Sequence, residues 1–169
     1  MFFSQALLEL ENPMNYSNSV GPICLLGPND RSFLADHLCN VAGWGHTKYN
    51  GSIQDLLHDV NVKLVDRTKC NSVQSYNGSV HERAICAGYE SGGRDACQYD
   101  SGGPLVCERN RQWYLVGQVS WGDKCALPHK YGVYSNMKLL APWVMKTIVG
   151  KWTEVENLSR WKPVILFAI

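Results

Sequence analysis

One short stretch of the chain carries residues whose types and spacing could perform covalent chemistry. Ser101 follows the acid Asp100 and precedes two glycines and a proline within residues 95–105. A serine hydroxyl beside paired glycines can lie on a tight turn, exposed and faced by backbone N–H groups. Such a hydroxyl is a weak nucleophile near neutral pH and needs a neighbouring base. The pattern indicates nucleophilic catalysis at Ser101, and the alternative is an ordinary turn serine.

The run Asp95-Ala-Cys-Gln-Tyr-Asp-Ser-Gly-Gly-Pro-Leu105 resembles the nucleophile segment of the trypsin-like serine proteases, whose usual form is Asp-x-Cys-Gln-Gly-Asp-Ser-Gly-Gly-Pro-Leu. This resemblance implies that Ser101 is the nucleophile and that the N–H groups of Tyr99 and Ser101 form the oxyanion hole. It places Asp95 at the base of the primary specificity pocket. The implied pocket walls are Ser120, Trp121, Gly122 and Gly132. A lone carboxylate in an apolar slot selects a long cation, so the implied substrate is a polypeptide with Arg or Lys before the scissile bond.

Three residues of the implied site depart from the family pattern. Tyr99 stands where the family has glycine, whose backbone angles cost other residues about 1 kcal/mol or more. We expect its ring to crowd the subsite for residues after the scissile bond. Lys124 lies at the pocket rim, where a small residue is usual, and could offset the charge of Asp95. Tyr131 replaces a common proline near Gly132.

The rest of the catalytic triad is missing from the sequence. None of the five histidines has the Ala-Ala-His-Cys context of the family's base, and Ser4 occupies the place of the third triad member, an Asp. These histidines are His37, His46, His58, His81 and His129, which we interpret as surface residues. We therefore expect the isolated chain to be inactive or nearly so. It is either a truncated endopeptidase domain or a catalytically inactive binding module.

Asp100 has a different implied role. In the family this carboxylate is buried and pairs with a new N-terminal ammonium group released by activation cleavage. That N-terminus would lie upstream of this sequence, and an unpaired buried carboxylate costs several kcal/mol. We therefore expect Asp100 to turn outward or become neutral. We also expect disorder around residues 92–101 and 120–126.

Seven cysteines without a Cys-x-x-Cys spacing argue against a zinc site and favour disulfides in an oxidising compartment. The resemblance implies three pairs, Cys39 with Cys107, Cys70 with Cys86, and Cys97 with Cys125. Cys24 is then left over. It would bond a light chain or the missing first barrel, or it would be a free buried thiol.

Composition excludes several partners. A net charge of +1 with 18% charged residues gives no field suited to nucleic acid. The apolar residues 164–169 are too few to span a membrane. No motif for a metal or cofactor is present. Four Asn-x-Ser triplets agree with a secreted glycoprotein, and the family resemblance implies a secreted or acrosomal location. The first ten residues lack the pattern of a signal peptide, so we expect upstream sequence.

The elements that must position these residues are short strands. Residues 60–65 alternate as a half-buried strand, residues 112–122 form a longer strand, and residues 139–149 have helical spacing with Gly150 after them. The resemblance covers about residues 4–150. It implies an all-β fold: the second six-stranded antiparallel β-barrel of the trypsin-like fold, a C-terminal α-helix and a remnant of the first barrel.

We predict three segments on this basis. Residues 1–38 form the first-barrel remnant and the crossing segment, residues 39–150 form the second barrel and helix, and residues 151–169 are a tail of unknown role. The run Cys70-Asn-Ser, continued by Tyr76-Asn-Gly-Ser-Val80, further resembles acrosin, the sperm acrosomal protease. That likeness implies an endopeptidase acting in fertilisation.

Overall fold

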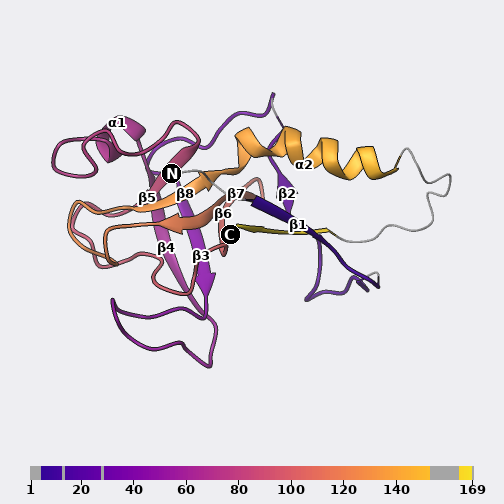
Figure 1. Cartoon of the computed structure of the whole chain (residues 1–169), viewed down its shortest axis with the longest axis horizontal. Coiled ribbons are helices and arrows are strands. Elements are labelled where there is room, and N and C mark those ends of the chain that lie inside the picture. The colour runs from indigo at the N-terminus through magenta and orange to yellow at the C-terminus, as the bar shows by residue number, and fades with distance from the viewer. Residues whose placement is uncertain (1–4, 13, 28, 153–163, 169) are drawn as a thin grey trace.

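A computed structural model of the chain describes residues 5–12, 14–27, 29–152 and 164–168 (Figure 1). Ser4, which occupies the place of the triad Asp in sequence, lies outside these residues. Six of the described strands form one closed antiparallel barrel. They are β3 (Leu38–Gly43), β4 (His58–Val65), β5 (Ala84–Gly88), β6 (Pro104–Arg109), β7 (Gln112–Trp121) and β8 (Gly132–Asn136).

The barrel closes because β7, at one end of the strand order, also pairs with β8 at the other end. The order runs β7-β6-β3-β4-β5-β8, and a further β7–β8 ladder joins the two ends. A register shift between Val119 and Trp121 accompanies this closure. Strand β2 (Cys24–Leu25) pairs in parallel with the part of β7 that β8 leaves uncovered. The predicted six-stranded antiparallel barrel is therefore confirmed.

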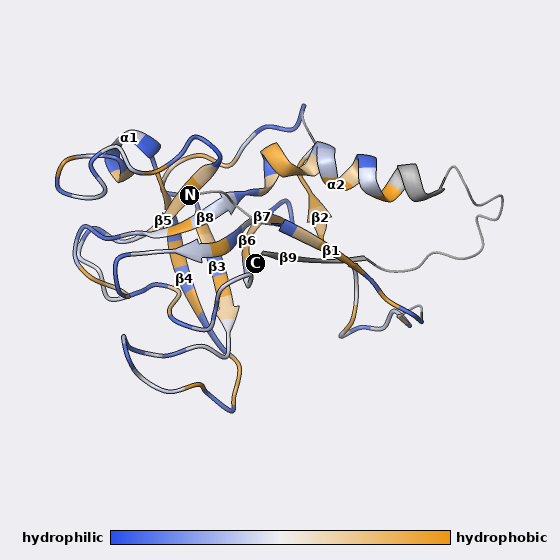
Figure 2. Cartoon of the chain, in the orientation of Figure 1, coloured by the Kyte–Doolittle hydropathy of each residue, from blue (hydrophilic) through white to orange (hydrophobic). Residues whose placement is uncertain are grey.

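Alternation along the strands builds the core of the barrel. In β4 the side chains of Val62 and Leu64 are buried while Lys63 between them is exposed. They meet Val41 and Leu105 of the facing strands inside the barrel. Figure 2 shows the corresponding apolar colouring of β3, β4 and β5. Each fully buried Val or Leu contributes about 1.5–3 kcal/mol.

Two helices lie outside the barrel (Figure 1). The short α1 (Arg67–Cys70) begins where the Asp66 side chain accepts a 2.7 Å hydrogen bond from the Thr68 N–H. The longer α2 (Met137–Trp152) begins two residues before the expected range. Its buried Met137 and Val144 pack with Leu115 of β7. The predicted C-terminal helix is therefore present.

The N-terminal strand finds its partner at the other end of the chain. Strand β1 (Gln5–Glu9) pairs antiparallel with β9 (Val164–Ala168), a partner that the sequence did not suggest. Strand β1 is only half-buried to exposed, although Leu7 packs on the cluster around Met137. No helix in the described part of the chain is long and apolar enough to cross a membrane. The proposed division into three segments stays a prediction.

Three disulfides join the pairs that the resemblance implied. The S–S bonds link Cys39 to Cys107, Cys70 to Cys86, and Cys97 to Cys125. The half-buried Cys24 is free and accepts a hydrogen bond from the Gln112 side chain at 2.9 Å. The first bond fastens β3 to β6, and the third fastens the nucleophile segment to the loop after β7.

Removing a disulfide is expected to destabilise the chain according to the loop that it closes. The double variant Cys39→Ala/Cys107→Ala opens a loop of 68 positions and should lose about 4 kcal/mol of unfolding free energy. Cys70→Ala/Cys86→Ala opens 16 positions and should lose about 3 kcal/mol. Urea unfolding measures both. Cys24→Ser is the control, and a loss there as large as in either double variant would contradict this account.

Candidate active site

The nucleophile segment is a turn fastened to strand β7. Ser101 is exposed on this turn, one residue before Gly102, whose φ of +82° favours glycine. The Gly102 N–H donates to the Val119 carbonyl at 2.8 Å, and the Val119 N–H donates to the Gly103 carbonyl at 2.9 Å. These two bonds hold the hydroxyl-bearing residue at the end of the barrel.

The Asp100 carboxylate lies inside the structure, so its expected outward turn is wrong. One oxygen accepts a hydrogen bond from the Gly45 N–H at 2.8 Å, and the other accepts from the Cys97 N–H at 3.0 Å. A side chain at Gly43 or Gly45 would collide with this carboxylate. Two backbone N–H groups therefore serve as the partners of the Asp100 carboxylate.

These bonds also order the neighbourhood of Asp100. The structure places every residue of 92–101 and 120–126, where the sequence led us to expect disorder. The Cys97–Cys125 disulfide joins the two segments covalently. The Gly93 N–H adds a 2.8 Å hydrogen bond to the Ala126 carbonyl.

A cavity of about 170 Å³ opens beside Ser101. It brings together Asp95 and Ser101 with all four of the implied pocket walls. Its lining includes Ser120, Trp121, Gly122 and Gly132 from β7, the following loop and β8. Tyr49, Lys124 and Tyr134 also line it. The sequence-predicted pocket residues therefore converge on one cavity.

Two polar atoms at this cavity are buried without a partner. One Asp95 oxygen accepts from the Ala126 N–H at 3.0 Å, but its Oδ1 has no hydrogen-bond partner among the described residues. The buried Tyr134 hydroxyl likewise has none in that part of the chain. Burial raises the pKa of Asp95 to about 6. Gly132 leaves them room, because a Cβ there would lie 2.5 Å from Asp95 Oδ1.

Tyr99 holds its side chain away from this cavity. Its φ of +72° is in the region that favours glycine, and the residue is 69% exposed. The ring lies against His46, with centroids 4.8 Å apart. Neither the Tyr99 nor the Ser101 N–H donates a hydrogen bond to another described residue. Both N–H groups are therefore without a hydrogen-bond acceptor among the described residues.

No histidine in the described ranges hydrogen-bonds Ser101. His37 bonds the Glu108 carbonyl at 3.0 Å, His46 bonds the Gln98 side chain at 3.2 Å, and His81 accepts from the Arg83 N–H. The described residues therefore place the Ser101 hydroxyl at a pocket with no histidine base in contact with it.

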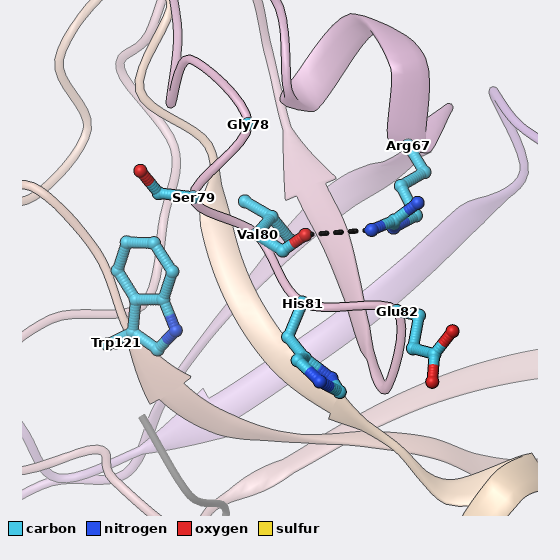
Figure 3. A pocket seen from close by; sticks show the side chains of 7 residues that line it. All are labelled: Arg67, Gly78, Ser79, Val80, His81, Glu82 and Trp121. Atoms are coloured by element: carbon cyan, nitrogen blue, oxygen red, sulfur yellow. Dashed lines mark hydrogen bonds between the residues drawn. The ribbon is translucent and has the colours of Figure 1, made fainter.

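A second cavity lies on the α1 side of Trp121 (Figure 3). It encloses about 350 Å³ and includes neither Ser101 nor Asp95 in its lining. The Arg67 guanidinium in it donates to the Val80 carbonyl at 3.0 Å, as the dashed line shows (Figure 3). Its cation is therefore engaged with the backbone.

Three residues of the site were not foreseen from the sequence. Tyr134 follows Gly132 by two positions in β8, so strand periodicity could have placed both on one face. Tyr49 and the Gly45 N–H come from the loop between β3 and β4. That loop lies about fifty positions before Ser101, and no local pattern signals the contact.

The comparisons with known proteins agree with this geometry. The protein family described as Trypsin matches residues 4–144. The chain is 41% identical over 145 residues to coagulation factor XI of Bos taurus, a match covering 86% of this chain and 23% of that protein. It is 42% identical over 146 residues to transmembrane protease serine 5 of Homo sapiens, covering 86% and 32% respectively. The chain thus corresponds to a third or less of each relative.

Glycine at position 99 is expected to fit its backbone better than alanine. Tyr99→Gly should be more stable than Tyr99→Ala by about 1 kcal/mol, because both lose the ring but only alanine keeps the strain of φ +72°. Trp113, an exposed residue of β7, is the control site, where alanine should be the more stable substitution. Denaturant unfolding of the four variants measures the difference. The same order of stability at both sites would contradict the strain at position 99.

Proposed function

The chain belongs to the trypsin family of serine proteases, and on this premise we propose that it is the pocket-bearing part of an endopeptidase that cleaves after Arg or Lys. One observation carries the proposal. The buried Asp95 Oδ1 and Tyr134 hydroxyl lack partners at a cavity that also holds Ser101. A cationic side chain would supply the missing donors, and its peptide carbon would then lie near the nucleophile.

The chain's own residues have defined parts in this chemistry. The Ser101 hydroxyl attacks the carbonyl carbon, and the N–H groups of Tyr99 and Ser101 stabilise the charge that develops on the carbonyl oxygen. The proton of Ser101 must pass to a base, and none of the described histidines contacts it. We propose that the histidine and its orienting carboxylate come from residues outside this chain.

We further propose a covalent partner for Cys24 and a biological role for the chain. Cys24, free and half-buried beside Gln112, would form a disulfide to a light chain or to the first barrel. The acrosin-like run from Cys70 to Val80 supports a secreted or acrosomal endopeptidase acting in fertilisation.

A catalytically inactive binding module is the rival function. The missing histidine contact and the Tyr99 side chain favour it. The two functions differ in one outcome. A longer protein that adds a histidine-bearing first barrel should be labelled at Ser101 by a fluorophosphonate if it is a protease, with Ser101→Ala as the control. Absence of labelling in that protein would favour the binding module.

Asp95 is expected to determine cation binding. Fluorescent p-aminobenzamidine should bind the chain, and Asp95→Asn should weaken that binding at least tenfold because the amide carries no charge. Asp55→Asn, which changes an exposed acid of the loop between β3 and β4, is the matched control and should bind normally. Equal affinities of the wild type and Asp95→Asn would overturn the proposed specificity.

The same binding should depend on pH through Asp95. Because burial raises its pKa to about 6, the carboxylate is mostly protonated below that pH and cannot attract a cation. Affinity for p-aminobenzamidine should therefore rise with pH, be about tenfold weaker at pH 5 than at pH 8, and level off above pH 7. Titration of fluorescence at several pH values measures this. A flat profile between pH 5 and pH 8 would contradict the assignment.

A further inference from the structure

We propose that Lys124, held over the mouth of the specificity pocket by Tyr49, is a specificity-determining residue that weakens the binding of cations at Asp95. The proposal rests on the proposed function of this pocket. It follows from the positions of two side chains that line the cavity beside Ser101.

Lys124 and Tyr49 approach the cavity from opposite segments. Lys124 lies in the loop between β7 and β8, and Tyr49 lies in the loop between β3 and β4. The Lys124 Nζ is 5.8 Å from the centroid of the Tyr49 ring. A cation at this distance from an aromatic face is attracted by it. The two residues, both exposed, therefore lie together in the lining of the pocket.

The loop that carries Tyr49 is hydrogen-bonded to the nucleophile segment. The neighbouring Asn50 N–H donates to the Gln98 side-chain oxygen at 2.7 Å, and the Gln98 side-chain nitrogen donates back to Asn50 at 3.3 Å. The His46 N–H donates to the Gln98 carbonyl at 2.9 Å. The residue that follows Tyr49 is thus bonded to Gln98, three residues before Ser101.

Lys124 has no carboxylate partner in the part of the chain described. The adjacent Asp123 pairs with Lys130 at 3.6 Å. The backbone of Lys124 has a φ of +60°, in the region that favours glycine. Among the described residues, no ion pair accounts for a lysine at this position, and the backbone conformation would favour glycine instead. The contact with the Tyr49 ring is the interaction that orients the ammonium group of Lys124.

The consequence is a cation at the mouth of a cavity whose base carries an anion. A ligand cation that reaches Asp95 must be accommodated near this like charge, and Coulomb repulsion in a partly desolvated cavity reduces its affinity. The repulsion falls as salt screens the exposed ammonium group. The pocket consequently binds small cations less tightly than its buried carboxylate alone would allow.

Removing the charge at position 124 while keeping its length tests the proposal. In the full chain at pH 8 and low salt, Lys124→Met should bind p-aminobenzamidine about 3- to 10-fold more tightly than the wild type. Lys124→Arg, the matched control, should bind within about twofold of the wild type because it keeps the charge. In 0.5 M NaCl the difference between Lys124→Met and the wild type should shrink. Tyr49→Leu should give a smaller gain, about twofold, by releasing Lys124.

The outcomes separate this proposal from the function on which it rests. Equal or weaker binding by Lys124→Met, with Asp95→Asn still impaired, would overturn the role of Lys124 and leave the proposed function standing. Normal binding by Asp95→Asn would instead overturn the proposed function. An unchanged affinity in Tyr49→Leu would overturn the role of the ring. Lys124→Met does not change the backbone strain at this position, because lysine and methionine both disfavour a positive φ. Thermal unfolding confirms that the variants are folded.

Discussion

The Asp100 carboxylate, bonded to the Gly45 and Cys97 N–H groups, is the interaction on which the site depends. It joins the loop after β3 to the turn before β6. It also fixes the backbone conformation of the residues that follow Asp100. Tyr99 and Ser101 flank this anchored residue, so the anchoring of Asp100 also determines where their N–H groups and the Ser101 hydroxyl lie. Charged acceptors bind backbone donors more strongly than neutral ones do, which suits a carboxylate to this role.

The site keeps several unfavourable features that the surrounding structure must offset. Asp95 has an unpaired buried oxygen, and Tyr99, Lys124 and Ala126 have positive φ angles. Each such feature costs stability, and such features gather where a ligand is to be bound. The closed barrel and the Cys97–Cys125 disulfide hold these segments in place despite the cost. Of these residues, Asp95 and Lys124 line the same cavity as Ser101.

Much of this architecture could be predicted from the sequence, because local patterns specify it. Alternation marked β4, and the motif around Ser101 identified the pocket residues and the disulfide pairs. What could not be predicted depends on contacts between distant segments. The backbone partners of Asp100 are one case, since a hydrogen bond to a main-chain N–H leaves no signal in residue type. The pairing of β1 with β9 is another, since a short apolar strand can pair with any free edge.

The most direct test of the central claim is the effect of Asp100→Asn on the affinity of the chain for p-aminobenzamidine at pH 8. Asp100 does not line the cavity beside Ser101, so it acts there through the backbone that it anchors and through its charge, which is close enough to raise the pKa of Asp95. The amide can satisfy only one of the two N–H donors, and we expect at least a tenfold loss of affinity while far-UV circular dichroism shows the barrel intact. An unchanged affinity in a folded Asp100→Asn variant would show that the pocket forms without this anchor.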